Sequence, residues 1–302
     1  MNDHSHAMPQ HDTDTPLPEP RFIPGLSAIA EGYDAFILDI FGVLHNGVEL
    51  YSGTINCLEH LKANGKSICL VSNTPRLKDG IIEDLDAIGL PQTLYDDIVT
   101  AGDSARAKLE TLHGQCGYFA GIERFHALFE GIDITITDNI ERADFILNAI
   151  SGQQDKEVPH TQTIWETGIA RNLPMVCANP DMVVNIGDRQ FQCAGTFALQ
   201  YEQMGGHVSY HGKPHPQIYT EARKRLGMPP KDKMLAVGDS FKTDMAGACH
   251  FGIDCVLNMV GIHYEEIKDV IKPRGGIDSD RLTFFTQHYA VQPTAFMHHL
   301  EW

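Results

Sequence analysis

Short apolar runs that end in polar residues alternate with amphipathic helical stretches along most of this chain. Ala35–Ile40, Ser67–Ser72 and Met234–Val237 are such runs, and their length and continuity are typical of buried parallel strands. In open α/β sheets, ligands bind in the crevice outside the carboxyl ends of the strands. The alternation therefore predicts an α/β fold with a parallel sheet, and it predicts a site where these strands end.

The residues at the first two strand ends suit phosphoryl chemistry. Asp39 ends an apolar strand and Gly42 lets the chain turn sharply behind it, so a carboxylate there is exposed at its tip as a nucleophile must be. Ser72 and Asn73 follow the next strand and precede a helix, where hydroxyl and amide donors can bind phosphoryl oxygens. Taken singly, each is also explained as a turn or a cap.

Two later segments add a cation and further carboxylates. Lys213, in Gly212-Lys213-Pro214, would neutralise charge that develops beside Asp39. Asp239 follows a strand, and Asp244 comes one helical turn later at the start of a predicted helix, Asp244–Phe251. Mg²⁺ prefers such hard oxygen ligands. Asp239 is predicted to bind Mg²⁺ directly, and Asp244 to bind it through water or to orient Asp239. A helix N-terminus alone would explain Asp244 but not a Gly-Asp at a strand end.

The middle of the chain reads as a separate α/β unit. Residues 114–200 contain alternating strands and helices, including a predicted helix at Glu123–Phe129, and they lack the catalytic residue types. They lie between the segments that carry Ser72 and Lys213. We predict that they form an inserted cap over a core of residues 25–113 and 201–302, after a disordered tail at 1–24. The cap's Asn179-Pro180-Asp181 is either a substrate-facing loop or an ordinary turn.

Composition limits the partners and the compartment. The formal charge of −17 disfavours nucleic acid and anionic membranes, and no apolar run approaches the roughly 18 residues of a membrane span. The seven cysteines show no metal-ligand spacing, and several lie in apolar runs, which indicates reduced thiols and a cytoplasmic location. A small phosphorylated molecule is the expected ligand, and the sequence leaves a homodimer open.

Together the four polar segments resemble the haloacid dehalogenase superfamily of aspartyl-nucleophile hydrolases. The insertion, Cys177-Ala178-Asn179-Pro180-Asp181 and Gly212-Lys213-Pro214-His215-Pro216 are similar to its class IIA branch, which includes nitrophenyl, pyridoxal and sugar- or nucleotide-phosphate phosphatases. The resemblance covers about residues 33–265. It implies a Rossmann-like core with an α/β cap, Mg²⁺ dependence and an aspartyl-phosphate intermediate. With Ser72 and Asn73, we predict that Gly42, Asn179 and Asp181 contact the substrate or its phosphate.

The chain departs from that pattern at Phe41, where most phosphatases of the superfamily have a second Asp as general acid/base. The family's backbone metal ligand at this position is a carbonyl, which Phe41 retains. Three functions stay open: a phosphatase that works without this acid or recruits His45, a phosphate-ligand binder with little or no turnover, and a dehalogenase, whose relatives carry an aromatic residue here. Because dehalogenases of the superfamily need no Mg²⁺, the Asp239 and Asp244 pair argues against the last.

Overall fold

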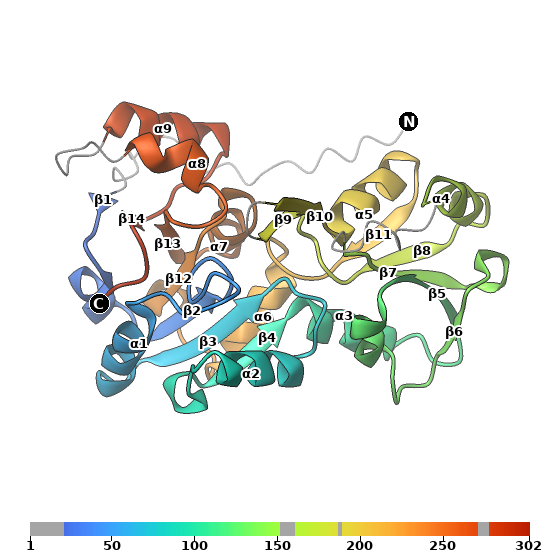
Figure 1. The fold of residues 1–302 in the computed structure, drawn as a ribbon, viewed down its shortest axis with the longest axis horizontal. Coiled ribbons are helices and arrows are strands. Elements are labelled where there is room, and N and C mark those ends of the chain that lie inside the picture. The colour runs from blue at the N-terminus through green and yellow to red at the C-terminus, as the bar shows by residue number, and fades with distance from the viewer. Residues whose placement is uncertain (1–20, 152–160, 187–188, 271–277) are drawn as a thin grey trace.

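The computed structural model describes residues 21–151, 161–186, 189–270 and 278–302. Figure 1 shows two lobes along the long axis, each built on a sheet and covered by helices. Most of the predicted N-terminal tail, residues 1–20, lies outside the described residues. Its last part is not a tail, because β1 (Arg21–Phe22) pairs in parallel with β14 (Ala295–Met297) near the C-terminus.

The larger lobe contains a seven-stranded sheet in which every strand pairs in parallel with its neighbours. Its spatial order is β1, β14, β13 (Asp254–Asn258), β12 (Met234–Gly238), β2 (Ala35–Asp39), β3 (Ser67–Ser72) and β4 (Asp97–Thr100). From β2 the chain proceeds outward to β3 and β4, and from β12 it proceeds the other way. The order therefore reverses between β2 and β12, which is where a doubly wound sheet opens a crevice.

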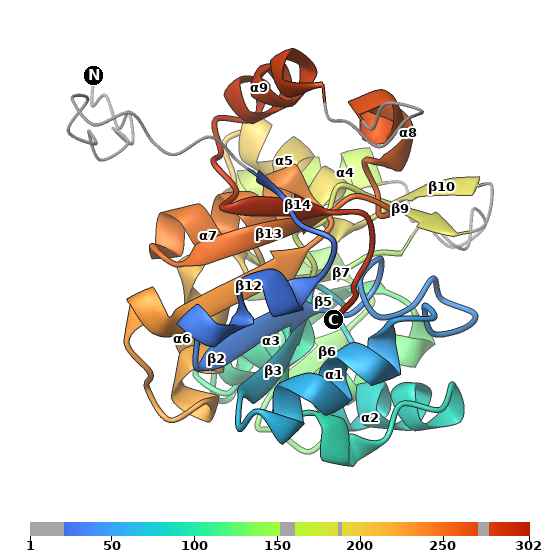
Figure 2. The ribbon, with the colours of Figure 1, turned by 90° about the vertical axis from the view of Figure 1, so that its left-hand side faces the viewer.

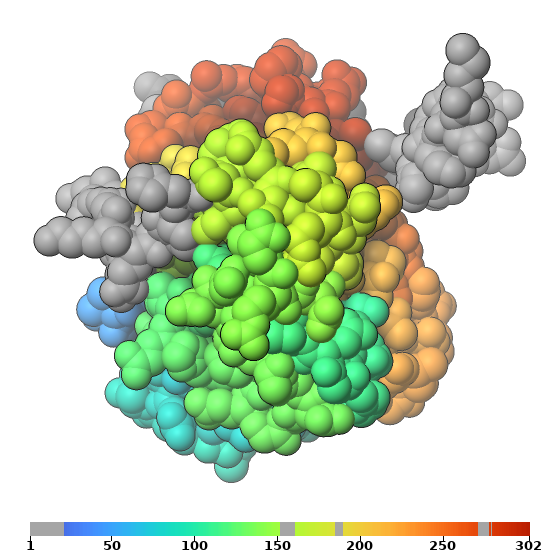
Figure 3. Space-filling model, turned by 90° about the vertical axis from the view of Figure 1, so that its right-hand side faces the viewer, coloured from blue at the N-terminus to red at the C-terminus, as the bar shows by residue number. Residues whose placement is uncertain are grey.

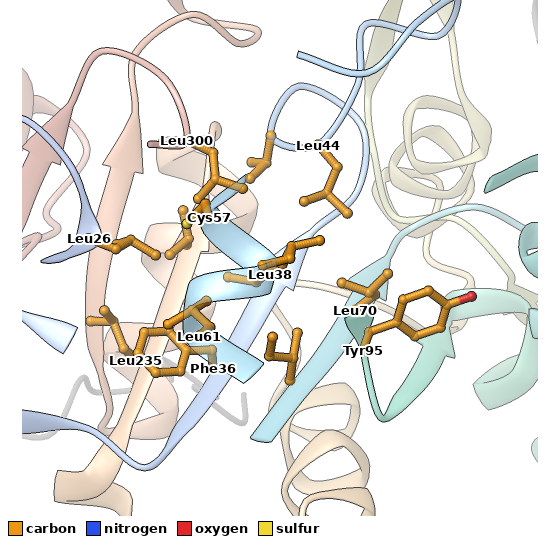
Figure 4. Close-up of a cluster of buried hydrophobic side chains, with 14 of the residues drawn as sticks. Leu26, Phe36, Leu38, Leu44, Cys57, Leu61, Leu70, Tyr95, Leu235 and Leu300 are labelled. Carbon is orange, nitrogen blue, oxygen red and sulfur yellow. The ribbon is translucent and has the colours of Figure 1, made fainter. Parts of the chain in front are cut away.

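Both faces of this sheet are buried, which explains the unbroken apolar strands. Along β2, Phe36 and Leu38 join a cluster with α1 and α2, whereas Ala35 and Ile37 point to a cluster with α6 and α7, as the two-residue period of a strand requires. Figure 4 shows the first cluster, with Leu61 of α1 packed beside Phe36. The helices of this lobe are α1 (Thr54–Ala63), α2 (Lys78–Ala87), α3 (Ala101–Leu109), α6 (Pro216–Arg225), α7 (Ala246–Phe251), α8 (Tyr264–Ile267) and α9 (Ser279–His288). Short 3₁₀ turns lie at Leu26–Ala28, Ala30–Gly32, Gln92–Leu94, Lys231–Lys233 and Lys268–Val270.

The smaller lobe carries a five-stranded parallel sheet of its own. Its spatial order is β11 (His207–Tyr210), β8 (Pro174–Cys177), β7 (Phe145–Ala149), β5 (Cys116–Gly121) and β6 (Thr135–Thr137). Helices α4 (Thr161–Ala170) and α5 (Ala194–Gln203) and 3₁₀ turns at Glu123–Leu128 and Ile140–Arg142 complete it, with an antiparallel hairpin of β9 (Val183–Ile186) and β10 (Arg189–Gln192). Figure 3 views the molecule from this lobe, whose green and yellow surface faces the reader.

The structure corrects three expectations about this order. Strand β11 was expected to resume the core series after residue 200, but it pairs with β8, so the smaller sheet continues to Tyr210. The expected helix at 123–129 is a 3₁₀ turn. The expected helix from Asp244 to Phe251 begins as a π-helical turn, Phe241–Met245, before α7. The exact boundary between cap and core stays a prediction, and residue 200 falls within α5.

The last strand, β14, is not at the edge of the core sheet but lies between β13 and β1. Figure 2 shows β14 crossing beside β13 below α9. All seven cysteines lie in described residues, and all are free thiols. Among the helices of the described ranges, none is long and apolar enough to cross a membrane.

We predict that the smaller sheet depends strongly on Phe145, which is fully buried and packs so tightly on Gly117 that a Cβ there would overlap its ring. Phe145→Ala should lower the free energy of unfolding by about 3–5 kcal/mol, the usual cost of removing a buried Phe side chain. Urea denaturation followed by circular dichroism measures this. Phe284→Ala is the matched control, since Phe284 is 61% exposed. Equal effects of the two substitutions would contradict the packing argument.

Candidate active site

The sheet brings the predicted catalytic strands together at the point where the strand order reverses. Leu38 of β2 pairs with Val237 of β12, so Asp39 and Asp239 lie at the carboxyl ends of neighbouring parallel strands. Strand β3 lies on the other side of β2 and ends at Ser72. The sequence prediction that these strand ends lie close together is confirmed.

A buried lysine joins two of the acidic residues. Lys213 Nζ lies 2.6 Å from Asp39 Oδ1 and 2.8 Å from Asp244 Oδ1, and all three side chains are about nine-tenths buried or more. Burial alone would lower the pKa of Lys213, but the charges of Asp244 and Asp39 outweigh it and raise that pKa above its ordinary value. The ammonium therefore stays charged beside Asp39.

Asp239 is held against the backbone on two sides. Its Oδ2 accepts a hydrogen bond from Ile262 N–H at 2.8 Å, and a Cβ at either Gly42 or Gly261 would overlap its carboxylate. Gly42 has φ +84°, so glycine is needed there both for its backbone angle and for this close approach. Gly42, expected to contact substrate, thus has an observed role in seating Asp239.

The negative charge of three carboxylates exceeds the positive charge of the Lys213 ammonium. Oxygen atoms of Asp39, Asp239 and Asp244 all lie within 4.8 Å of one another. Burial raises the pKa of Asp39, the charge of Asp244 raises it further, and Lys213 opposes both. Burial and Asp244 likewise raise the pKa of Asp239 to about 7. This uncompensated negative charge and the oxygen donor set fit a hard divalent cation such as Mg²⁺.

Local backbone geometry directs Asp244 into the cluster. The π-helical turn Phe241–Met245 follows Ser240, whose side chain caps it by accepting from Thr243 N–H. Asp244 Oδ2 accepts from Ser240 N–H at 3.2 Å, and a Cβ at Gly238 would overlap the Asp244 side chain. Glycine is therefore required at 238 for steric reasons, and π turns are frequent at functional sites.

Ser72 and Asn73 differ in the hydrogen-bonding groups that they leave available to a ligand. Ser72 Oγ accepts a hydrogen bond from Thr74 N–H at 3.3 Å, which leaves the hydroxyl proton available to a ligand. The Asn73 carboxamide is instead taken up by protein groups. Its Oδ1 accepts from Lys213 N–H at 2.6 Å, and its Nδ2 donates to Lys213 O at 3.0 Å and to Asp181 Oδ1 at 2.7 Å.

The smaller lobe reaches the site through the turn at Asn179. Asn179 Oδ1 accepts from Asp181 N–H at 2.9 Å, which fixes the turn, and Asp181 then contacts Asn73 of the core. Burial raises the pKa of Asp181, and the hydrogen bond from Asn73 opposes that rise. Of the two alternatives for this segment, the loop therefore lies at the site, and direct substrate contact by Asn179 or Asp181 stays a prediction.

Phe41 and His45 form their own contact beside the nucleophile. Their rings meet edge to face with centroids 5.7 Å apart, and a Cβ at Gly47 would overlap the Phe41 ring. His45 Nδ1 accepts a hydrogen bond from Gly47 N–H at 2.8 Å, and burial lowers the pKa of His45. The neutral imidazole therefore carries its proton on Nε2 and has no free nitrogen lone pair with which to act as a base.

Sequence reasoning missed Asn258, which is fully buried at the end of β13 and donates from Nδ2 to Gly42 O at 2.6 Å. This bond braces the loop that carries Phe41 and Gly42. It also missed Tyr219, whose hydroxyl donates to Asp244 O at 3.0 Å from beneath. The sequence does contain a signal for Asn258, because this Asn ends an apolar strand just as Asp39 does. Tyr219 gave no such signal, since it lies on an amphipathic helix.

Comparisons with known proteins identify relatives of this chain. Sequence profiles of haloacid dehalogenase-like hydrolases match residues 36–135 and 210–279. A haloacid dehalogenase-like hydrolase from Brucella suis 1330 is 30% identical, with a TM-score of 0.77 over 92% of this chain and 100% of that one. A p-nitrophenyl phosphatase from Archaeoglobus fulgidus is 21% identical, with a TM-score of 0.69 over 88% of this chain and 96% of that one. An acid sugar phosphatase of Staphylococcus aureus is 21% identical over 76% of this chain and 88% of its own length.

The acidic cluster generates a test of metal binding. Asp239→Asn should shift the Mg²⁺ dependence of the thermal unfolding temperature to concentrations higher by about tenfold or more, because a buried anionic oxygen is lost. Asp244→Asn should shift it less, since Asp244 already shares its charge with Lys213. Asp232→Asn, an exposed residue before the opposite end of β12, is the control. An unchanged titration for Asp239→Asn would remove the proposed metal site.

Proposed function

Since this chain belongs to the haloacid dehalogenase-like hydrolases, we propose that it is a Mg²⁺-dependent phosphomonoester hydrolase acting on a small phosphorylated metabolite. The observation that carries the proposal is the contact of Lys213 with Asp39 inside a cluster of three buried carboxylates. It combines a nucleophile, a fixed positive charge and a cation site at one strand end. These are the requirements of phosphoryl transfer, in which positioning and charge neutralisation supply most of the rate.

In the first step, Asp39 attacks phosphorus and the bond to the leaving oxygen breaks, which leaves an aspartyl phosphate and an oxyanion that takes its proton from water, because Phe41 supplies none. Asp39 Oδ1 accepts from Ile40 N–H at 2.7 Å and contacts Lys213, so Oδ2 is the oxygen that attacks. Lys213 neutralises charge on the transferred group, and the free proton of Ser72 binds one of its oxygens. Asp39 then carries the phosphoryl group until water releases it.

The residues that would hold Mg²⁺ are Asp39, Asp239 and Asp244, with the Phe41 carbonyl added by the family resemblance. When bound, the cation supplies charge neutralisation for the phosphoryl oxygens and offsets the excess of buried carboxylates. Of the three carboxylates, Asp239 is the one most available to bind the cation, because no cationic side chain among the described residues forms an ion pair with it. The backbone of Gly42, Gly261 and Ile262 fixes its orientation.

Hydrolysis of the aspartyl phosphate is the step that this chain is least equipped to accelerate. Water must lose a proton as it attacks phosphorus, and Phe41 has no group to accept it. His45 is the nearest alternative in sequence, but its Nδ1 is bonded to Gly47 N–H and its Nε2 carries the proton. We therefore infer that the second step limits turnover.

The substrate class rests on the relatives and the cap. The similar Staphylococcus protein is an acid sugar phosphatase and the Archaeoglobus protein a p-nitrophenyl phosphatase, which supports a small phosphate monoester here. Access would be controlled by the smaller lobe, whose Asn179–Asp181 turn reaches the site.

The main competing function is that of a phosphate-ligand binder with little turnover. Phe41 favours this function because it lacks the carboxylate that would act as general acid/base. A dehalogenase is less compatible, because dehalogenases of the superfamily need no Mg²⁺, whereas Asp39, Asp239 and Asp244 form a cluster that could hold one. Assay of p-nitrophenyl phosphate with and without Mg²⁺ separates these functions. Turnover that requires Mg²⁺ supports the phosphatase, tight phosphate binding without turnover the binder, and metal-independent halide release from a haloacid the dehalogenase.

Asp39→Asn should reduce turnover by about 10³-fold or more while the protein stays folded, because the shape is kept and the nucleophilic charge is lost. The measurement is initial rate with p-nitrophenyl phosphate, accompanied by circular dichroism. Asp34→Asn is the matched control, since Asp34 is exposed just before β2 and far from its catalytic end. Activity above about a few per cent of wild type would place the nucleophile elsewhere.

Phe41→Asp should raise turnover by about tenfold or more, because it returns a proton acceptor to the attacking water. Pre-steady-state kinetics should give a burst of product in the wild type, and this burst should disappear in the variant. Phe41→Leu is the control, since it alters packing against His45 without adding an acid. A folded Phe41→Asp protein with equal or lower turnover would show that the second step is not limited by the missing carboxylate.

A further inference from the structure

Asn73 lies where three parts of the chain meet: the end of β3, the linker that carries Lys213, and the turn of the smaller lobe. The packing there leaves no spare volume. A Cβ at Gly212, which has φ +119°, would overlap Asn73 Oδ1 and crowd Pro180 and Ala101. Core, cap and linker are therefore in contact at a single amide group.

Both N–H donors of that amide are used by protein groups. A carboxamide offers two N–H donors and one carbonyl oxygen. Asn73 uses the oxygen and one donor to hold both sides of the Lys213 peptide backbone, and it gives the other donor to Asp181. Asn73 is 4% exposed, so no donor is left to bind a phosphoryl oxygen. Its geometry suits a residue that positions Lys213.

Asp181 is in turn fixed by the smaller lobe. Its N–H donates to Asn179 Oδ1, and its carbonyl accepts from Gly195 N–H at 3.1 Å in α5. A Cβ at Gly195 would overlap the Pro180 carbonyl, so α5 packs directly on the turn. Movement of the cap would therefore move the Asp181 carboxylate relative to Asn73.

We propose that Asn73 and Asp181 are positioning residues that couple the seating of the cap to the placement of Lys213, and that they do not bind the phosphoryl group. The chain of contacts runs from Asp181 to the Asn73 amide, to the Lys213 backbone, and from Lys213 Nζ to Asp39. The assignment of a catalytic effect rests on the proposed hydrolase function. The placement of Lys213 itself can be tested without it.

The experiment compares Asp181→Ala with Asp181→Asn. Asn at 181 can still accept a hydrogen bond from Asn73 Nδ2, although more weakly than a carboxylate, whereas Ala cannot. We expect kcat for p-nitrophenyl phosphate to fall by about tenfold in Asp181→Ala and by a smaller factor in Asp181→Asn, with KM changed little in both. Asp138→Asn, which removes one exposed negative charge from the same lobe, is the matched control.

A second readout follows Lys213 directly and needs no turnover. Lysine acylation by a small amine-reactive reagent, read by peptide mass spectrometry, should be slow at wild-type Lys213, which is 3% exposed and held by two carboxylates. It should become faster in Asp181→Ala and Asn73→Ser, relative to Lys62 in its distant ion pair with Asp96. Thermal unfolding of each variant separates this change from general loss of structure.

Two results would overturn the coupling. One is a rise in KM with unchanged kcat and unchanged Lys213 acylation, which would make Asp181 a substrate-binding residue. The other is an equal loss in Asp181→Asn and Asp181→Ala with Lys213 still protected, which would mean that the carboxylate itself exchanges a proton. Absence of turnover in the wild type would remove the proposed hydrolase instead, while faster acylation in the variants would still support the positioning of Lys213.

Discussion

The contact of Lys213 with Asp39 and Asp244 is the interaction on which the rest of the site depends. Removing one member of a buried ion pair typically costs about 3–5 kcal/mol, because the remaining charge is left without compensation. Lys213 arrives on the linker between the two lobes, while Asp39 and Asp244 come from the core. Its position requires Gly212 to pass close to Asn73, and Asn73 to hold the Lys213 backbone. The catalytic charge pattern therefore depends on how the smaller lobe is joined to the core.

The same cluster explains why a cation belongs to the site. One ammonium faces three carboxylates, and burial makes that imbalance costly, as the pKa of Asp239 near 7 reflects. A divalent cation would restore the balance and at the same time supply charge for a phosphate ester. Stability and function are thus linked through one group of residues, since the charges that are costly in the folded protein are those that would bind the metal and attack the substrate.

Phe41 separates the two halves of the proposed reaction. Attack by Asp39 needs charge neutralisation, which Lys213 and the metal ligands would supply, whereas release of phosphate needs a proton acceptor. The Phe41 ring packs against His45, and His45 Nδ1 accepts a hydrogen bond from Gly47 N–H, so aromatic packing organises this loop. A chain with this arrangement would form the covalent intermediate more readily than it would discharge it.

Local signals in the sequence determined the α/β alternation and the residue types at the ends of β2, β3 and β12. They did so because a buried parallel strand must be apolar throughout and polar where it emerges. Only the tertiary structure decided that β11 pairs with the smaller sheet and that Asn73 binds the Lys213 backbone. The same is true of the hydrogen bonds from Asn258 to Gly42 and from Tyr219 to Asp244. Each of these rests on contact between residues far apart in the chain, and spacing along a sequence carries no information about which backbone group a distant side chain will meet.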